Sequence, residues 1–170
     1  RNQDVLPIAA ECNEIAEANG FERPTWDNFV AKVAFAITEL DEGRDSALGL
    51  AGDPLGEELA DTVIRLLSVL DAVWGPESWS DRVTGRGQKQ ISTFAPIEVL
   101  LWPTLGYLCK ALDARCYDDR VGAEACVGLA ILEAWRLADA LKIDLTYEVL
   151  KKCEKNRGRG HLHGKAYAAG

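Results

Sequence analysis

Apolar residues recur at helical spacing along nearly the whole chain, and no stretch alternates apolar and polar residues as a half-buried strand would. The pattern predicts six helices, at about residues 3–19, 25–45, 53–74, 95–117, 121–142 and 144–156. The clearest stripe belongs to the third helix and consists of Leu59, Val63, Leu66, Leu70 and Val73. Six amphipathic helices without strands predict one all-α domain, residues 1–170, built as a helical bundle.

Local signals mark where several helices begin and end. Gly20 follows the first helix, and glycine readily adopts the left-handed conformation that closes a helix. Asp53 is a good N-cap for the third helix, with Pro54 suited to its first position, and Asp144 is the expected cap of the last. The polar residues 76–93 are predicted to form a long loop.

Composition and charge restrict the kinds of partner that this chain is expected to bind. No apolar run is long enough to cross a bilayer, so we expect a soluble, cytoplasmic protein without membrane contact. The net charge of -8 opposes nonspecific binding to nucleic acid and favours cations, metals included. The five cysteines show no CxxC pair and no companion histidine cluster, which argues against a disulfide framework or a zinc site.

Two carboxylate pairs are the first chemical candidates. Glu39 and Glu42 lie three residues apart on the second predicted helix, and Glu58 and Asp61 do so on the third. Four such carboxylates on adjacent helices can form an oxygen cage for Mg²⁺, a metal that usually keeps substrate phosphates in its shell. Acidic pairs at this spacing also arise by chance, so ordinary solvated carboxylates remain the alternative.

The sequence lacks the residues that several other classes of enzyme require. A di-iron carboxylate bundle needs Glu-x-x-His pairs, whereas the two histidines, His161 and His163, lie in the basic tail. The sequence also lacks a GxxxxGK phosphate loop and a Gly-x-Ser-x-Gly elbow, which argues against P-loop enzymes and serine hydrolases of that type.

Two segments resemble a known family. KVAFAITELDEGRDSAL followed by GEELADTVIRLLSVLDAVW is similar to the paired acidic helices of MazG-like nucleotide pyrophosphohydrolases, the all-α NTP pyrophosphatases. The family signature is Glu-x-x-Glu followed by Glu-x-x-Asp, and here fifteen residues separate the two pairs. Near the end, IDLTYEVLKKCEKNRGRGHLHGK resembles the closing helix and its Lys-x-x-x-Asn-x-x-Arg pattern, with Lys152, Asn156 and Arg159 at those positions, followed by His163.

The resemblance covers residues 3–74 and 129–165 and implies a bundle of that family with an extra helical segment. About residues 75–128, including a helix in which Pro103 should cause a kink, form an insertion relative to short members. The resemblance implies a homo-oligomer, with a dimer expected, although the insertion could cover a surface that short forms bury against another subunit.

The resemblance implies cleavage of an NTP or dNTP to the monophosphate and pyrophosphate, in a role such as nucleotide-pool cleansing. Mg²⁺, or Mn²⁺ in its place, would be held by Glu39, Glu42, Glu58 and Asp61. Glu39 or Glu42 would accept the proton of the attacking water. The phosphates would be bound by Lys152, Asn156 and Arg159, with help from His163.

Two further residues each have a functional and a structural alternative. Trp26 could stack on the base or be buried, and Lys32 could reach a phosphate or lie on the surface. Arg65, four residues after Asp61, is expected to form an ion pair with that carboxylate. Two rival functions remain open: a phosphoribosyl-ATP pyrophosphohydrolase, and a noncatalytic helical interaction protein derived from this family.

Overall fold

The computed structural model describes residues 5–50, 52–75 and 95–159. Of these residues 79% are helical and none is in a strand, so the all-α prediction is confirmed. The helices are α1 (Val5–Ala18), α2 (Phe29–Ala47), α3 (Leu55–Trp74), α5 (Ile97–Cys116), α6 (Arg120–Ala140) and α7 (Leu145–Arg157). The predicted loop at 76–93 and the two tail histidines lie outside the described residues.

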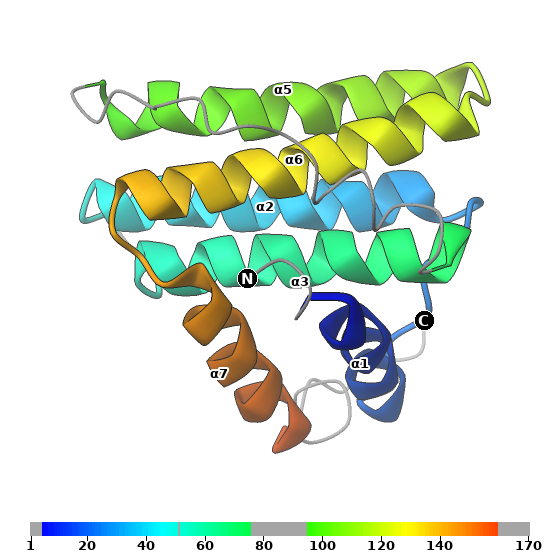
Figure 1. The fold of residues 1–170 in the computed structure, drawn as a ribbon, viewed down its shortest axis with the longest axis horizontal. Helices are drawn as coiled ribbons and strands as arrows, with labels where there is room; N and C mark the ends of the chain where they lie inside the picture. The colour runs from blue at the N-terminus through cyan, green and yellow to red at the C-terminus, as the bar shows by residue number, and fades with distance from the viewer. Residues whose placement is uncertain (1–4, 51, 76–94, 160–170) are drawn as a thin grey trace, which may run out of the picture.

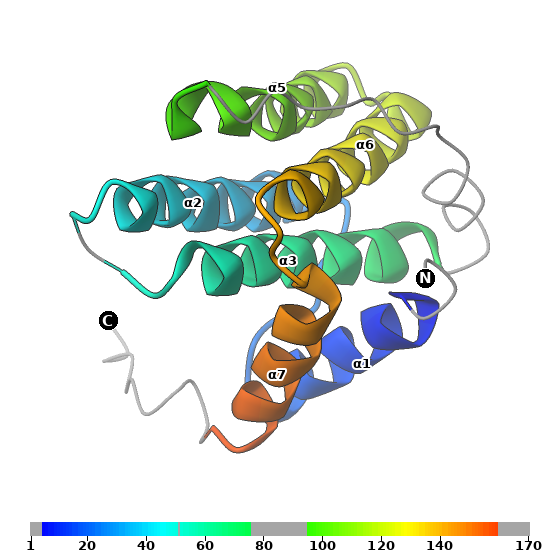
Figure 2. The same cartoon turned by 60° about the vertical axis from the view of Figure 1, so that its left-hand side comes forward.

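Two helical hairpins form the body of the molecule (Figure 1). The antiparallel helices α2 and α3 make one, and α5 and α6 make the other, which packs alongside the first. Helices α1 and α7 cross the opposite side of α3, as the turned view shows (Figure 2). Helix α3 therefore packs against α1, α2, α6 and α7 and is the centre of the fold.

The position of α3 explains its composition. The predicted stripe residues Leu59, Val63, Leu66 and Leu70 are fully or almost fully buried. Burial of such a side chain contributes about 1.5–3 kcal/mol each, so this stripe is a major source of stability. Because α3 has neighbours on several sides, polar residues on its other faces are also drawn into the interior.

The ends of the helices test the local signals. Gly20 has φ 84°, and the Phe21 N–H donates to the Ala16 carbonyl at 2.9 Å, so the predicted end of α1 is confirmed within one residue. The Asp144 side chain accepts from the Tyr147 N–H at 3.1 Å, which confirms that cap.

The prediction for the start of α3 is wrong about both Asp53 and Pro54. Pro54 takes the N-cap position, the helix begins at Leu55, and the Asp53 side chain makes no capping hydrogen bond. Instead the Asp53 carboxylate lies 3.5 Å from the Lys152 ammonium and 3.8 Å from that of Lys155. Two cations from α7 attract this carboxylate away from the helix end.

The segment that the family resemblance treats as extra is part of the core. Leu108 of α5 and Val127 of α6 are fully buried, and their helices pack on α2 and α3 respectively. Pro103 lies within α5. Among the described helices, none combines the length and apolar character needed to cross a membrane.

Candidate metal and phosphate site

Three of the four predicted carboxylates meet between α2 and α3. One oxygen each from Glu39, Glu58 and Asp61 lies within 4.8 Å of the others. The antiparallel hairpin places residue 39 opposite the first turns of α3, and the three-residue spacing puts Glu58 and Asp61 on one side of that helix. We call these three residues the acidic cluster.

A glycine allows the two helices to approach at this point. Gly43 is buried one turn beyond Glu39, and a Cβ added there would lie 3.2 Å from both the Glu58 Cβ and a Leu55 methyl group. This distance is tighter than ordinary van der Waals contact, so a larger residue would require the Glu58 and Leu55 side chains to shift by a few tenths of an ångström. Gly43 thus helps to bring the carboxylates together.

Glu42, the fourth predicted ligand, lies outside the acidic cluster. Its side chain is exposed, and it does not belong to the group of three whose oxygens converge. Its negative charge nevertheless contributes to raising the pKa of Glu58, so it lies close enough to act on the cluster electrostatically.

Glu58 is the carboxylate most affected by its surroundings. It is 3% exposed, and its Oε1 accepts a hydrogen bond from the Asp53 N–H at 3.2 Å. Burial, together with the charges of Glu39, Asp61 and Glu42, raises the pKa of Glu58 to about 7. Burial also raises the pKa of Asp61. The cluster therefore holds more negative charge than its surroundings readily stabilise.

Lys152 supplies a buried cation beside the cluster. It is 4% exposed, and its Nζ lies 2.7 Å from the Asp61 Oδ2. Burial lowers the pKa of Lys152, but the hydrogen bond to Asp61 and the nearby acids outweigh this and leave the pKa raised. Because α7 packs on α3, two residues that lie 91 positions apart in the chain form one ion pair.

A second ion-pair group, which the sequence analysis did not identify, borders the first. Glu57 lies 3.0 Å from the Lys151 ammonium and 3.3 Å from that of Lys155. Hydrogen bonds from Lys151 and then Lys155 lower the pKa of Glu57 to about 2. The residues themselves were visible in the sequence, since the last helix carries Lys151, Lys152 and Lys155 and Glu57 directly precedes Glu58. Spacing along the chain could not show that these lysines and Glu57 meet.

Arg65 does not pair with Asp61 as the sequence predicted. Its Nε donates to the Glu39 Oε1 at 2.6 Å, across the α2–α3 interface. The guanidinium carbon also lies 5.4 Å from the ring centroid of Phe35, which is 51% exposed. Phe35 precedes Glu39 by about one helical turn, so an exposed aromatic ring lies on the same side of α2 as a cluster carboxylate.

The remaining predicted phosphate ligands lie at and beyond the end of α7. Asn156 is one turn after Lys152 and is partly buried, and Arg159 follows the helix, also partly buried. The Asn156 carbonyl accepts from the Asn19 side chain at 2.9 Å, and its own Oδ1 is buried with no hydrogen-bond partner among the described residues. Lys32 donates to the backbone carbonyl of Glu22, and His163 is outside the described residues.

Trp26 lies at the other end of the hairpin and is not brought to the acidic cluster. It is 9% exposed, and its indole N–H donates to the Asp118 carboxylate at 2.6 Å. Its ring packs 5.1 Å from Phe29 and 5.9 Å from Trp74, centroid to centroid. Two guanidinium groups cover it as well, those of Arg115 at 4.8 Å and Arg120 at 4.9 Å. Of the two alternatives for Trp26, stacking on a base or burial in the protein, the structure shows burial.

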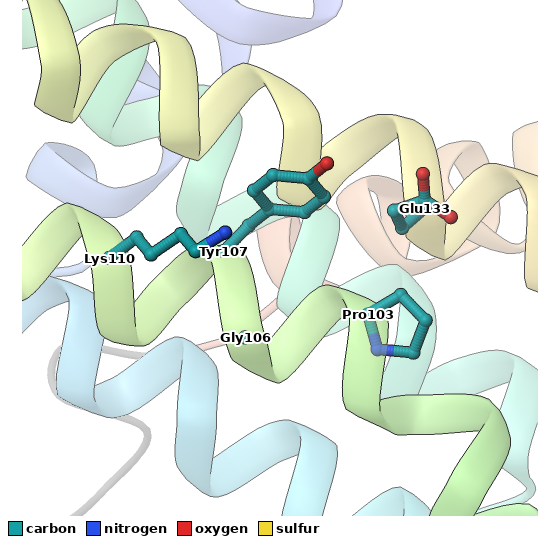
Figure 3. Close-up of a pocket in the computed structure, with 5 residues that line it drawn as sticks. All are labelled: Pro103, Gly106, Tyr107, Lys110 and Glu133. Atoms are coloured by element: carbon teal, nitrogen blue, oxygen red, sulfur yellow. The ribbon is translucent and has the colours of Figure 1, made fainter.

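Two open hollows lie away from the cluster. One, of about 270 Å³, is lined by Pro103, Gly106, Tyr107 and Lys110 of α5 and by Glu133 of α6 (Figure 3). There the Lys110 ammonium lies 5.3 Å from the Tyr107 ring centroid. The other, of about 210 Å³, is formed by residues of α1 and its end together with Arg157. Neither is lined by a carboxylate of the acidic cluster.

Comparison with known proteins adds no relative. No protein-family model matches the chain, and the searches of curated proteins and of solved structures found no match.

Proposed function

We propose that this chain is a divalent-metal-dependent nucleoside triphosphate pyrophosphohydrolase, which cleaves an NTP or dNTP to the monophosphate and pyrophosphate in a nucleotide-pool cleansing role. The observation that carries the proposal is the convergence of Glu39, Glu58 and Asp61 within 4.8 Å, with the Lys152 ammonium 2.7 Å from Asp61. Carboxylates and a neighbouring cation are the groups that phosphoryl chemistry requires for positioning and charge stabilisation.

The donor set fits Mg²⁺ or Mn²⁺. Carboxylate oxygens are the ligands that these hard cations prefer, and three are available in the acidic cluster. Burial and then the charges of the neighbouring carboxylates raise the pKa of Glu58, and a bound cation would relieve this repulsion. When bound, such a cation would neutralise phosphate oxygens and acidify a water molecule.

The chain's own residues would then have separate tasks. Glu39, Glu58 and Asp61 would hold the cation, and Arg65 would fix the orientation of Glu39 through its 2.6 Å hydrogen bond. Glu42, exposed at the edge of the cluster, would accept the proton of the attacking water. This division assigns Glu42 to proton transfer rather than to metal binding.

Helix α7 would bind the phosphate chain. The buried Lys152 orients Asp61 and adds one positive charge beside the cluster. Asn156 and Arg159 continue this polar side of the molecule toward the end of α7, where a triphosphate extending from the cluster would meet them. His163 and Lys32 remain candidates of the same kind.

Phe35 is our candidate for the nucleobase contact. Trp26 precedes Glu39 by thirteen residues, which corresponds to about 20 Å along a helix and is too far for a base whose phosphates reach the cluster. Phe35 is about one turn from Glu39, exposes its ring, and has the Arg65 guanidinium beside it. Such a ring can stack with a base.

The direct test is pyrophosphate release from the common NTPs and dNTPs, with dUTP and oxidised or methylated nucleotides added, in the presence and absence of Mg²⁺. We expect metal-dependent turnover of one or a few nucleotides, with the monophosphate as the second product. A folded protein that releases no pyrophosphate from any of them would contradict the proposal and favour the noncatalytic interaction protein. A phosphoribosyl-ATP substrate would be tested in the same assay.

A further inference from the structure

Two buried cysteines face one another across the contact between α1 and α7. The Cys12 and Cys153 sulfur atoms lie 3.8 Å apart, although the residues are 141 positions apart in the chain. Both side chains are almost fully buried, and both helices pack on α3. Of the described cysteines, only these two lie within hydrogen-bonding distance of each other.

The geometry is close to what a covalent bond requires. A disulfide has a sulfur–sulfur distance of about 2.05 Å, so the two atoms would need to approach by about 1.7 Å. Side-chain rotation with a small shift of one helix can supply such a movement. The other cysteines offer no equivalent, since Cys109 and Cys116 are exposed on α5 and Cys126 is partly buried on α6.

We propose that Cys12 and Cys153 are a redox-sensitive pair that forms an intrachain disulfide between α1 and α7 when the protein meets a small oxidant such as hydrogen peroxide. In the first step one of the two sulfur atoms attacks a peroxide oxygen, the O–O bond breaks, and a sulfenic acid and one water form. In the second, the other thiol's sulfur attacks the sulfenic acid sulfur, the S–O bond breaks, and a second water leaves. The two thiols lose two electrons and peroxide is reduced to two waters.

The two thiols also affect each other's ionisation. The hydrogen bond between them lowers the pKa of Cys153 and raises the pKa of Cys12. Thiolate is the reactive form, so one thiol of the pair is oxidised first and the other resolves the intermediate.

The link would fix the helix that carries Lys152. Cys153 directly follows Lys152 on α7, and the disulfide would tie α7 to α1 while both remain on α3. An effect on nucleotide hydrolysis rests on the proposed function, whereas formation of the disulfide does not. The chemical test below therefore stands even if the proposed function fails.

The test uses a variant in which Cys109, Cys116 and Cys126 are replaced by serine, so that only the buried pair remains. The dilute folded protein is treated with hydrogen peroxide, denatured, alkylated and analysed by intact mass and by non-reducing peptide mapping. We expect the loss of two hydrogen atoms, no alkylation, and a linked peptide pair that contains Cys12 and Cys153. Because the bond closes a loop of more than a hundred residues, we expect Tm to rise by about 5–10 °C and to return after reduction.

The matched control adds Cys153→Ser to the same background and should show neither the mass change nor the rise in Tm. The proposal is overturned if both thiols are alkylated after oxidation, if they carry sulfinic acid, or if the links join two chains. Should the triple-serine background not fold, peptide mapping of the oxidised native chain gives the same decision, because a Cys12–Cys153 peptide pair either is found or is not.

Discussion

The α2–α3 hairpin has two contrasting ends. Near its turn, the acidic cluster draws three carboxylates together beside one buried ammonium. At its open end, Trp26 and Trp74 pack around Phe29, and the Trp26 indole N–H is hydrogen-bonded. The contacts of Trp26 at the aromatic end are favourable, whereas at the acidic end the Lys152–Asp61 and Arg65–Glu39 pairs lie beside carboxylates that repel one another.

Under the proposed function, the aromatic end serves stability and the acidic end serves chemistry. Aromatic rings that pack edge-on with their polar atoms bonded stabilise a fold directly. Carboxylates whose pKa is raised by burial and by one another's charge oppose folding, and such arrangements are concentrated at functional sites. The contrast therefore supports assigning function to the turn end of the hairpin.

The largest expected effect is at the aromatic end. Replacing Trp26 by Ala should lower the free energy of unfolding by about 3–5 kcal/mol, because a large buried ring and its hydrogen bond are lost. Chemical denaturation measures this. The control Trp102→Ala, at an exposed position of α5, should change stability by less than about 0.5 kcal/mol. Equal costs for the two variants would show that Trp26 is not a core residue.

At the acidic end, Glu58→Gln should reduce metal-dependent pyrophosphate release by at least about 100-fold, equivalent to about 2.7 kcal/mol in the barrier. Stability should be unchanged or higher, because a buried negative charge is removed while glutamine can still accept the hydrogen bond from Asp53. Glu154→Gln, on the exposed side of α7, is the control and should keep full activity. Activity in Glu58→Gln that matches this control would contradict the metal assignment.

A smaller effect should show whether Phe35 or Trp26 contacts the nucleobase. Phe35→Ala should raise KM about 5–10-fold with little change in kcat, the loss expected when one stacking contact of about 1–1.5 kcal/mol is removed. Steady-state kinetics on the best substrate measure it, with Val30→Ala as the control because that residue is also exposed on α2. Trp26→Phe should leave KM unchanged. The reverse result would restore Trp26 as the base contact.

The smallest effect concerns pH. The pKa of Glu58 rises from 4.5 to about 7 on folding, so between these values the folded state binds more protons than the unfolded state. The free energy of unfolding therefore falls as the pH rises through this interval. When a chelator has removed divalent metal ions, Tm should drop by about 2–4 °C from about pH 5 to about pH 7.5.

Adding Mg²⁺ at the higher pH should raise Tm again, because the cation binds the folded state with its carboxylates ionised. In Glu58→Gln the pH-dependent fall should be reduced and the response to Mg²⁺ lost. A Tm that is independent of pH in the native protein would show that Glu58 is not held in the environment described above.

The sequence predicted the helices well because each helix depends on nearby residues. Apolar spacing located all six described helices to within a few residues, and the Asp144 cap depends on contacts within one turn. Asp53 was mispredicted because its carboxylate responds to lysines of α7, about a hundred positions away, rather than to its own helix. Arg65 was mispredicted for a related reason, since Glu39 of the neighbouring helix competes with the carboxylate one turn before it.

The residue types and spacing by themselves determined that this protein is helical, which faces of its helices are apolar, and where carboxylates and lysines are available. Tertiary structure decided which of them meet: it excluded Glu42 from the cluster, paired Lys152 with Asp61, buried Trp26 and placed Cys12 against Cys153. The physical reason is the distance along the chain over which the deciding interactions act. Helix formation follows from hydrogen bonds and side chains within a few residues, whereas charge, burial and thiol contact depend on how distant helices pack on α3.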